Sequence, residues 1–241
     1  MSEKRKFAVF DIDGTFYRDS LFLDVVNQLE SQGLLNTEKV AEHKVREAKW
    51  RARRHKQTYN EYLEATVETM MDSMSHLTPK DVEFAAEAVA SRRIEHVYSF
   101  TRDLAKHLKK QDYFLIAISG SQEEIVKHFV KFYEFDAYAC TEWHRSDDGE
   151  KYTGSAVVKK NNKEKYLQEI IEAHSLQVAG SYAVGDSAGD ISMLGFVEHP
   201  IAFNPEDVLF ETAKKHGWKI VIERKNVIYT LEQRDGSYVL E

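Results

Sequence analysis

The stretch from Phe7 to Tyr17, Phe-Ala-Val-Phe-Asp-Ile-Asp-Gly-Thr-Phe-Tyr, limits the possible folds of this chain more than any other segment. Four apolar residues run without alternation into two aspartates, which is typical of a strand buried on both faces of a parallel sheet. Asp11 and Asp13 then lie at the carboxyl end of that strand, where open α/β sheets bind ligands. Close carboxylates repel each other unless a cation lies between them or one is protonated. Their hard oxygen atoms favour Mg²⁺, although an ordinary solvated turn has the same pattern.

The spacing excludes two other ligand-binding loops. An EF-hand that begins at Asp11 needs an acid or amide at its fifth position and glycine at its sixth, and Thr15 and Phe16 occupy those positions. A Gly-x-x-x-x-Gly-Lys-Ser/Thr run is absent, which excludes a P-loop.

The bulk composition narrows the class of protein. The 241 residues carry a net charge of −7, so the chain lacks the basic excess of a dedicated nucleic-acid binder. Cys140 is the only cysteine, which excludes an internal disulfide and suits a reducing, cytoplasmic location. Only four apolar residues precede Asp11 and no long apolar run follows, so we expect neither a signal peptide nor a membrane span.

The hydrophobic pattern divides the chain into two parts. Residues 18–96 show helical spacing throughout, and glycine is absent from 34 to 119, which predicts a compact helical insert. Strands alternate with helices in the rest of the chain, which predicts a parallel sheet. We therefore expect a core of residues 1–17 and 97–241 and a helical domain of residues 18–96. The core includes a hairpin over 137–158 and a strand and hairpin extension over 219–241.

Polar residues follow each later strand of the core. Ser119 and Gly120 come after the strand that begins near Tyr113, and Asp186 and Asp190 come after the strand that ends at Val184. Lys163 begins a predicted helix between them. A serine at a strand end often only caps the next helix, and a lysine at a helix start is usually solvated. Two further carboxylates at a strand end are harder to explain without a ligand.

Taken together and in this order, these motifs resemble those of the haloacid dehalogenase superfamily of aspartate-dependent phosphotransferases. Asp11-Ile-Asp-Gly-Thr15 is similar to its first motif, Ser119-Gly-Ser121 to its second, Lys163 to its third, and Gly185-Asp186-x-x-x-Asp190 to its fourth. The insert after the first motif is similar to the cap of the phosphoserine-phosphatase-like branch, subfamily IB. Lys165 is a weaker candidate for the third motif.

The resemblance implies a fold and a reaction. The expected fold is a Rossmann-like, three-layer α/β/α core with a parallel sheet and a helical, C1-type cap inserted after the first strand. The expected activity is Mg²⁺-dependent hydrolysis of a small phosphomonoester through an aspartyl-phosphate, or transfer of the phosphoryl group to a second acceptor. A rival from another class is a non-catalytic module that binds an anion or a polynucleotide.

The resemblance also assigns roles to individual residues. Asp11 is the expected nucleophile, Asp13 the acid and base, and Asp190 the residue that holds metal-bound water or orients Lys163. Mg²⁺ is expected on Asp11, on the main-chain carbonyl of Asp13 and on Asp186. The phosphoryl oxygens are expected on Thr15, Ser119, Gly120 and Lys163.

Two positions depart from the phosphoserine phosphatase pattern. Ser20, beside Asp19, replaces the acidic residue that holds the amino group of the substrate, and Gly189 replaces the usual asparagine. Phosphoserine is therefore not the expected substrate, while the phosphate chemistry is unaffected.

The remaining candidates concern the substrate pocket and partners. Basic residues crowd one predicted helix, where Arg46, Lys49, Arg53 and Lys56 form a stripe. Such a stripe is usually a solvated face, but it also fits an anionic substrate. The candidates for the pocket are Phe16, Tyr17, Ser20, Arg46, Trp50 and Arg53, and core packing explains the aromatic ones equally well. The hairpin at the C-terminal end offers either a homodimer edge or a cover for the sheet.

Overall fold

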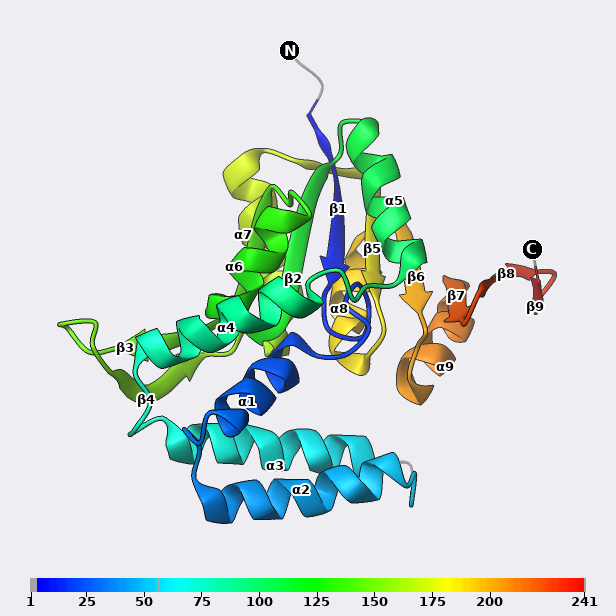
Figure 1. The fold of residues 1–241 in the computed structure, drawn as a ribbon. Coiled ribbons are helices and arrows are strands. Elements are labelled where there is room, and N and C mark those ends of the chain that lie inside the picture. The colour runs from blue at the N-terminus through cyan, green and yellow to red at the C-terminus, as the bar shows by residue number, and fades with distance from the viewer. Residues whose placement is uncertain (1–3, 56, 241) are drawn as a thin grey trace.

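The computed structural model describes residues 4–55 and 57–240, and a single sheet organises them (Figure 1). Its strand order is β4-β3-β2-β1-β5-β6-β7-β8-β9. The strands are β1 (Lys6–Asp11), β2 (Phe114–Gln122), β3 (Ala137–Arg145), β4 (Tyr152–Val157), β5 (Gln177–Gly185), β6 (His199–Phe203), β7 (Lys219–Arg224), β8 (Val227–Arg234) and β9 (Ser237–Leu240).

The middle of the sheet is parallel and its two edges are antiparallel. Strands β3, β2, β1, β5, β6 and β7 pair in parallel, whereas β4 at one edge and β8 and β9 at the other run antiparallel to their neighbours. The predicted hairpin over 137–158 is the pair β3–β4. The predicted extension over 219–241 continues the main sheet as β7, β8 and β9.

Helices cover both faces of the sheet and form an insert between β1 and β2 (Figure 1). The α-helices are α1 (Leu21–Ser31), α2 (Thr37–Arg51), α3 (Thr58–Ser73), α4 (Pro79–Arg93), α5 (Ser99–Lys110), α6 (Glu123–Phe132), α7 (Lys163–His174), α8 (Ile191–Phe196) and α9 (Asp207–His216). Two short 3-10 helices, η1 (Lys159–Asn162) and η2 (Ala188–Asp190), precede α7 and α8.

The apolar run of β1 is buried on both faces, as its sequence predicts. Phe7 and Val9 pack with α7, α8 and α9, whereas Ala8 and Phe10 pack with the helices of the opposite face. All four side chains are 0 % exposed. The structure therefore confirms the α/β fold, with Asp11 at the carboxyl end of the central strand.

Two helices of the insert begin at polar N-cap residues. Asn36 accepts hydrogen bonds from the first turn of α2, and Thr78 forms a capping box with Asp81 at the start of α4, next to Pro79. Helices α2 and α3 form an antiparallel hairpin that projects beyond the carboxyl ends of the parallel strands (Figure 1). Helix α4 instead lies against α6 of the core.

Some boundaries differ from the predicted ones. Strand β2 continues through Ser119 and Ser121 to Gln122, beyond the predicted end at Ile118. The helix predicted to begin at Lys163 does begin there, as α7, and the 3-10 helix η1 directly precedes it. In the part of the chain that the structure describes, none of the helices combines the length and apolarity needed to cross a bilayer.

Candidate active site

A buried lysine joins two buried aspartates at the carboxyl end of β1. The ammonium of Lys163 donates hydrogen bonds to Asp11 Oδ1 and, over 2.6 Å, to Asp190 Oδ1. The Lys163, Asp11 and Asp190 side chains are 4 %, 6 % and 0 % exposed. Charges this deep in a protein are stable only when they are paired, and the three side chains come from α7, β1 and η2.

Burial and the crowding of charge shift the pKa values of these groups. Burial raises the pKa of Asp11 to about 7. The positive charge of Lys163 lowers this pKa, whereas the negative charges of Asp190 and Asp13 raise it. Burial lowers the pKa of Lys163, but the charges of Asp11 and Asp190 outweigh it, so that this pKa is raised. Lys163 therefore remains an ammonium, whereas Asp11 exchanges its proton near neutral pH.

Asp186 completes a group of carboxylates that fits a metal ion. Carboxylate oxygens of Asp11, Asp186 and Asp190 lie within 4.8 Å of one another. Burial, together with the charges of Asp11 and Asp190, raises the pKa of Asp186 well above its usual value. The second oxygen of Asp11 is buried and has no hydrogen-bond partner among the described residues. An orphaned anionic oxygen beside a second carboxylate is what a divalent cation would satisfy.

The backbone around these carboxylates leaves no room for larger residues. Gly14 has φ +85°, and a Cβ added there would lie 2.3 Å from Asp186 Oδ2. Thr15 donates a hydrogen bond to Asp186 Oδ1 over 3.1 Å. Glycine is thus required at position 14 both by its left-handed backbone and by the approach of Asp186.

Asp13 is held apart from Asp11 by donors from β2 and α1. Ser119 Oγ donates to Asp13 Oδ2 over 2.7 Å, Ser121 Oγ donates to the same atom over 2.8 Å, and Leu21 N donates to Oδ1 over 2.6 Å. Ser119 was expected to hold a phosphoryl oxygen; here its hydroxyl orients Asp13. Ser121 was not among the predicted site residues, although its position two residues after Ser119 on one strand places both on the same face.

Asp190 holds its own loop as well as Lys163. Its Oδ2 accepts hydrogen bonds from the main-chain N–H groups of Asp186 and Ser187, over 3.1 and 2.9 Å, and from the Ser187 hydroxyl. Both oxygens of Asp190 are therefore occupied by protein donors. This arrangement fits the predicted role of orienting Lys163 better than direct metal ligation.

The predicted pocket residues near the first motif are buried. Phe16 and Tyr17 are 0 % exposed, and the ring of Phe16 packs edge-on against Phe10 and Phe129, so core packing accounts for both. Ser20 is also buried, and its hydroxyl accepts a hydrogen bond from Leu23 N as the N-cap of α1.

The predicted pocket residues of the basic helix lie on and beyond α2. Arg46 forms an ion pair with Glu61 over 3.4 Å, and Trp50 stacks on Tyr62 with ring centroids 5.3 Å apart. Arg53 is exposed and has a left-handed backbone, φ 46°. Lys56, the last member of the predicted stripe, lies outside the described residues.

Tyr59 is a residue of the insert that the sequence did not single out. It lies in the first turn of α3, and its ring packs 5.4 Å from that of Trp50. Partial burial raises the pKa of Tyr59, and the negative charges of Asp13 and Asp186 raise it further, although 38 % of the residue is exposed. Tyr59 is thus a residue of the insert on which the charges of the core carboxylates act.

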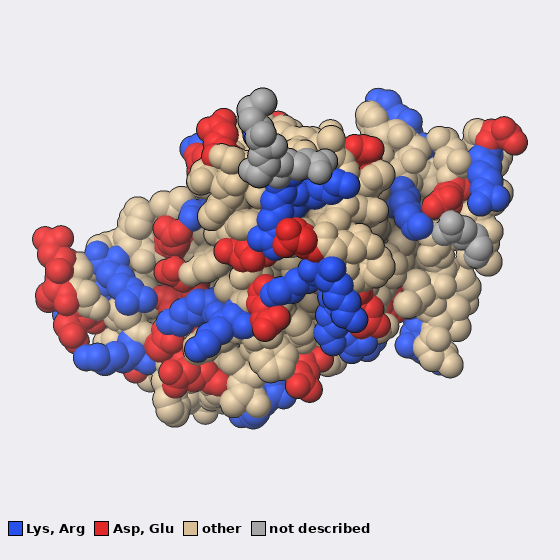
Figure 2. Space-filling model, turned by 90° about the horizontal axis from the view of Figure 1, so that it is seen from above, with Lys and Arg blue, Asp and Glu red and all other residues tan. Residues whose placement is uncertain are grey.

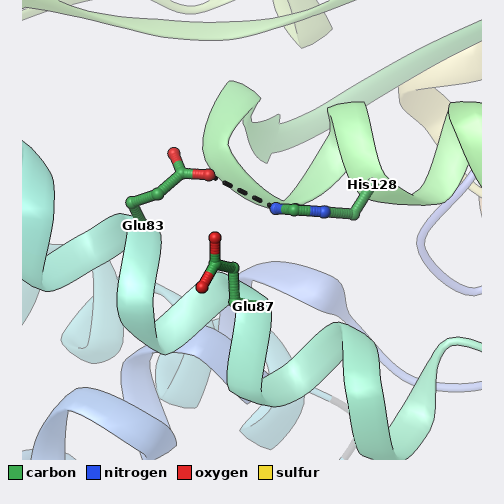
Figure 3. Close-up of side chains that lie close together, drawn as sticks. All are labelled: Glu83, Glu87 and His128. Carbon is green, nitrogen blue, oxygen red and sulfur yellow. Dashed lines mark hydrogen bonds and ion pairs between the residues drawn. The ribbon is translucent and has the colours of Figure 1, made fainter.

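A second group of potential metal ligands lies away from this site. Figure 3 shows Glu83 and Glu87, on one face of α4, directed toward His128 of α6. Glu83 already accepts hydrogen bonds from Lys127 Nζ over 2.5 Å and from His128 Nε2 over 3.3 Å. Because Lys127 neutralises Glu83, this group serves as an ionic bridge between the insert and the core.

The buried position of Lys163 leads to a prediction about stability. In the metal-free protein, Lys163→Met should lower the free energy of unfolding by about 3–5 kcal/mol, because it leaves Asp11 and Asp190 buried without their cation. Urea denaturation in the presence of a chelator measures this change. Lys165→Met is the matched control: Lys165 is 58 % exposed, and this variant should stay within about 0.5 kcal/mol of the wild type. Equal stability of both variants would contradict the assignment.

Comparison with known proteins identifies the relatives of this chain. The family model of haloacid dehalogenase-like hydrolases matches residues 8–195. A histidinol-phosphatase of Neisseria meningitidis is 24 % identical over 230 residues, covering 90 % of this chain and 98 % of the relative. A phosphoserine phosphatase of Methanocaldococcus jannaschii is 25 % identical over 230 residues, covering 94 % and 96 %.

A solved structure shares the fold. The structure of a phospho-aspartyl intermediate analogue of phosphoserine phosphatase superposes with a TM-score of 0.60 at 21 % identity, covering 92 % of this chain and 95 % of that one. The family model spans most of the chain, including all four motifs. The chain therefore belongs to the haloacid dehalogenase-like hydrolase family, and within it to the phosphoserine-phosphatase-like branch of phosphatases.

Proposed function

We propose that this chain hydrolyses a small phosphomonoester through an aspartyl-phosphate on Asp11. The observation that carries the proposal is the state of the Asp11 carboxylate. Lys163 binds one of its oxygens, and the other is buried without a hydrogen-bond partner among the described residues. A carboxylate oxygen of Asp11 also lies within 4.8 Å of carboxylate oxygens of Asp186 and Asp190. A purely structural aspartate would have both oxygens satisfied. An unsatisfied carboxylate oxygen favours a bound cation, and a carboxylate can attack phosphorus only beside positive charge that masks the phosphate.

The donor set fits Mg²⁺, which prefers oxygen ligands and binds through few carboxylates. Asp11 and Asp186 would hold the ion, together with the main-chain carbonyl of Asp13. When bound, it would neutralise phosphoryl charge and hold the phosphoryl group in line with the nucleophile. The names of the relatives, which are phosphatases, support the same chemistry.

Two residues of the chain share the chemical steps. Asp11 attacks phosphorus while the bond to the leaving oxygen breaks, and Asp13 gives that oxygen a proton. In the second step Asp13 takes a proton from water, the water oxygen attacks phosphorus, and the bond to Asp11 breaks to release phosphate. Ser119, Ser121 and Leu21 N hold Asp13 in place for both transfers.

The helical insert is proposed to act as a cap that covers the leaving group. Its α2–α3 hairpin projects past the carboxyl ends of the strands (Figure 1). Tyr59 lies in the first turn of α3, and the charges of Asp13 and Asp186 raise its pKa. A phenol at this place can donate a hydrogen bond to a leaving group while its ring excludes water.

The rival of an anion-binding module has less support. Three basic residues of α2 are paired, since Lys44 bonds Glu30, Arg46 bonds Glu61 and Arg51 bonds Glu47. On the opposite end of the molecule, seen in Figure 2, acidic and basic residues are interspersed. Among the described residues on that face, no broad basic surface stands out that could track a polynucleotide.

The surroundings of Ser20 favour substrates without an amino group. Asp19 Oδ2 accepts hydrogen bonds from Arg93 over 2.7 Å and pairs with His96 over 3.2 Å. The Asp24 carboxylate pairs with Arg93 over 3.0 Å and also accepts a hydrogen bond from the hydroxyl of Tyr17. Arg93 thus already neutralises Asp19 and Asp24, and a substrate ammonium would have to compete with it for these two carboxylates.

The proposed reaction predicts the effect of changing Asp11. Asp11→Asn should reduce hydrolysis of p-nitrophenyl phosphate in the presence of Mg²⁺ to background, because an amide retains the shape but not the nucleophilic charge. Asp103→Asn is the matched control, since the Asp103 side chain is 62 % exposed and pairs with Arg102; it should leave kcat within about twofold. Substantial turnover by Asp11→Asn, or full wild-type turnover after chelation of metal, would exclude the proposed function.

The raised pKa of Asp11 predicts a pH-dependent effect of Mg²⁺ on stability. Folding raises this pKa from 3.8 to about 7, so the metal-free fold loses stability as pH rises through that range and regains none above it. A cation bound to ionised Asp11 offsets this loss. The increase in Tm on adding Mg²⁺ should therefore be larger at about pH 8 than at about pH 5.5. The difference should shrink in Asp11→Asn, in which Asp186 remains as the metal-binding carboxylate with a raised pKa; the same increase at both pH values in the wild type would contradict the role of Asp11.

The Arg93 pairs predict the ranking of two related substrates. Phosphoserine should be hydrolysed with no higher kcat/KM than the phosphate ester of 3-hydroxypropionate, which differs from it only in lacking the amine. Arg93→Gln should raise the ratio of phosphoserine to this ester about tenfold, because it releases Asp19 and Asp24 for the ammonium. Arg92→Gln, at the neighbouring exposed position, should leave the ratio unchanged. A wild-type preference for phosphoserine would show that another group binds its ammonium.

A further inference from the structure

Lys160, in the 3-10 helix η1, lies beside the loop that follows the predicted second motif. A Cβ added to Gly120 would lie 2.9 Å from Cδ of Lys160 and 3.4 Å from its Cβ. The aliphatic stem of Lys160 therefore crosses Gly120 in close contact, and its ammonium lies two bonds beyond Cδ. Gly120 is flanked by Ser119 and Ser121, the two residues that hold Asp13.

Lys160 also borders the loop of the fourth motif. A Cβ added to Gly189 would lie 4.0 Å from the carbonyl oxygen of Lys160. The adjacent Asp190 binds Lys163, which follows Lys160 by three residues. Lys160 thus lies between the two loops that flank the Asp11 site, on the segment that supplies its buried lysine.

The two neighbouring lysines of η1 differ in what they bind. Lys159 pairs with Glu142, and its ammonium lies 5.3 Å from the centroid of the Tyr166 ring. Lys160 is exposed, and its ammonium makes no hydrogen bond or ion pair with a residue that the structure describes. Lys159 has a structural partner, whereas Lys160 remains available to a ligand.

The charge of the site indicates which ligand this is. Four carboxylates, those of Asp11, Asp13, Asp186 and Asp190, lie at this site, and Lys163 is the one buried lysine or arginine among the residues that the structure describes. A phosphomonoester adds further negative charge, and a bound divalent cation offsets only part of the total. The stem of Lys160 crosses Gly120, where a phosphoryl oxygen is expected, so an ammonium without a partner among the described residues is within reach of the entering dianion.

We propose that Lys160 is a second phosphate-binding lysine, which bonds an oxygen of the phosphoryl group as the substrate enters and of inorganic phosphate before it leaves. The proposal rests on the proposed phosphatase function of the Asp11 site. Since Lys160 binds the phosphoryl group and not the leaving group, its contribution is the same for every phosphomonoester.

The experiment compares Lys160→Met with the wild type for two substrates that share only the phosphate, p-nitrophenyl phosphate and propyl phosphate. KM for both should rise about tenfold, and so should the inhibition constant of inorganic phosphate, while kcat changes much less. The increase should shrink at high salt, because it is electrostatic. Lys160→Arg should restore most of the affinity, and Lys165→Met, on the first turn of α7, should show none of these changes.

Binding of inorganic phosphate, measured by calorimetry with Mg²⁺ present, separates this proposal from the proposed function. If the wild type binds phosphate but hydrolyses neither ester, the phosphatase function fails, and the loss of binding in Lys160→Met still decides the role of Lys160. Unchanged phosphate binding in Lys160→Met overturns the proposal. A rise in KM for only one ester, with unchanged phosphate binding, also overturns it and assigns Lys160 to the leaving group.

Discussion

The ion pairs of Lys163 are the interaction on which the site depends. One ammonium from α7 binds a carboxylate at the end of β1 and another in η2, and all three groups are almost fully buried. Segments far apart in the sequence are thereby held at one point of the sheet. The pairing leaves one oxygen of Asp11 without a partner among the described residues. The contact that satisfies three buried charges thus also holds the carboxylate that we propose as the nucleophile. Under that proposal, stability and reactivity at this site have a common origin.

Much of the fold and the core of the site could be predicted because their signals are local. Four consecutive apolar residues predict the buried strand β1, and Asp11 comes directly after these four residues. Parallel strands bring their carboxyl ends to one edge, so Asp186 and Asp190, which follow β5, had to approach Asp11. Lys163 required the resemblance to a family, since a lysine at a helix start carries no such signal by itself.

The parts that could not be predicted depend on contacts between distant segments. The influence of the Asp13 and Asp186 charges on Tyr59 depends on how the helical hairpin is placed over the sheet, which hydrophobic spacing does not specify. Arg93 pairs with Asp19 and Asp24 only because α4 returns beside the first loop. The sequence could not decide the role of Phe16 and Tyr17 for a related reason. An aromatic residue next to a site has the same sequence pattern whether it lines a pocket or fills the core. The exposed fraction of 0 % for both residues assigns them to the core.

The ionic bridge between α4 and α6 has a consequence for how this enzyme can diversify. Glu83, Lys127 and His128 tie α4 to the core, and Arg93 ties the end of that helix to the first loop. The α2–α3 hairpin precedes α4 in the chain and takes no part in these ion pairs. Under the proposed function, mutations in the hairpin would change the surroundings of the leaving group and leave the carboxylates of the sheet in place. The residues proposed for phosphoryl transfer lie on the sheet, whereas those proposed to select the substrate lie on the hairpin. The turns that flank the hairpin therefore separate the part that fixes the reaction from the part that can evolve toward new substrates.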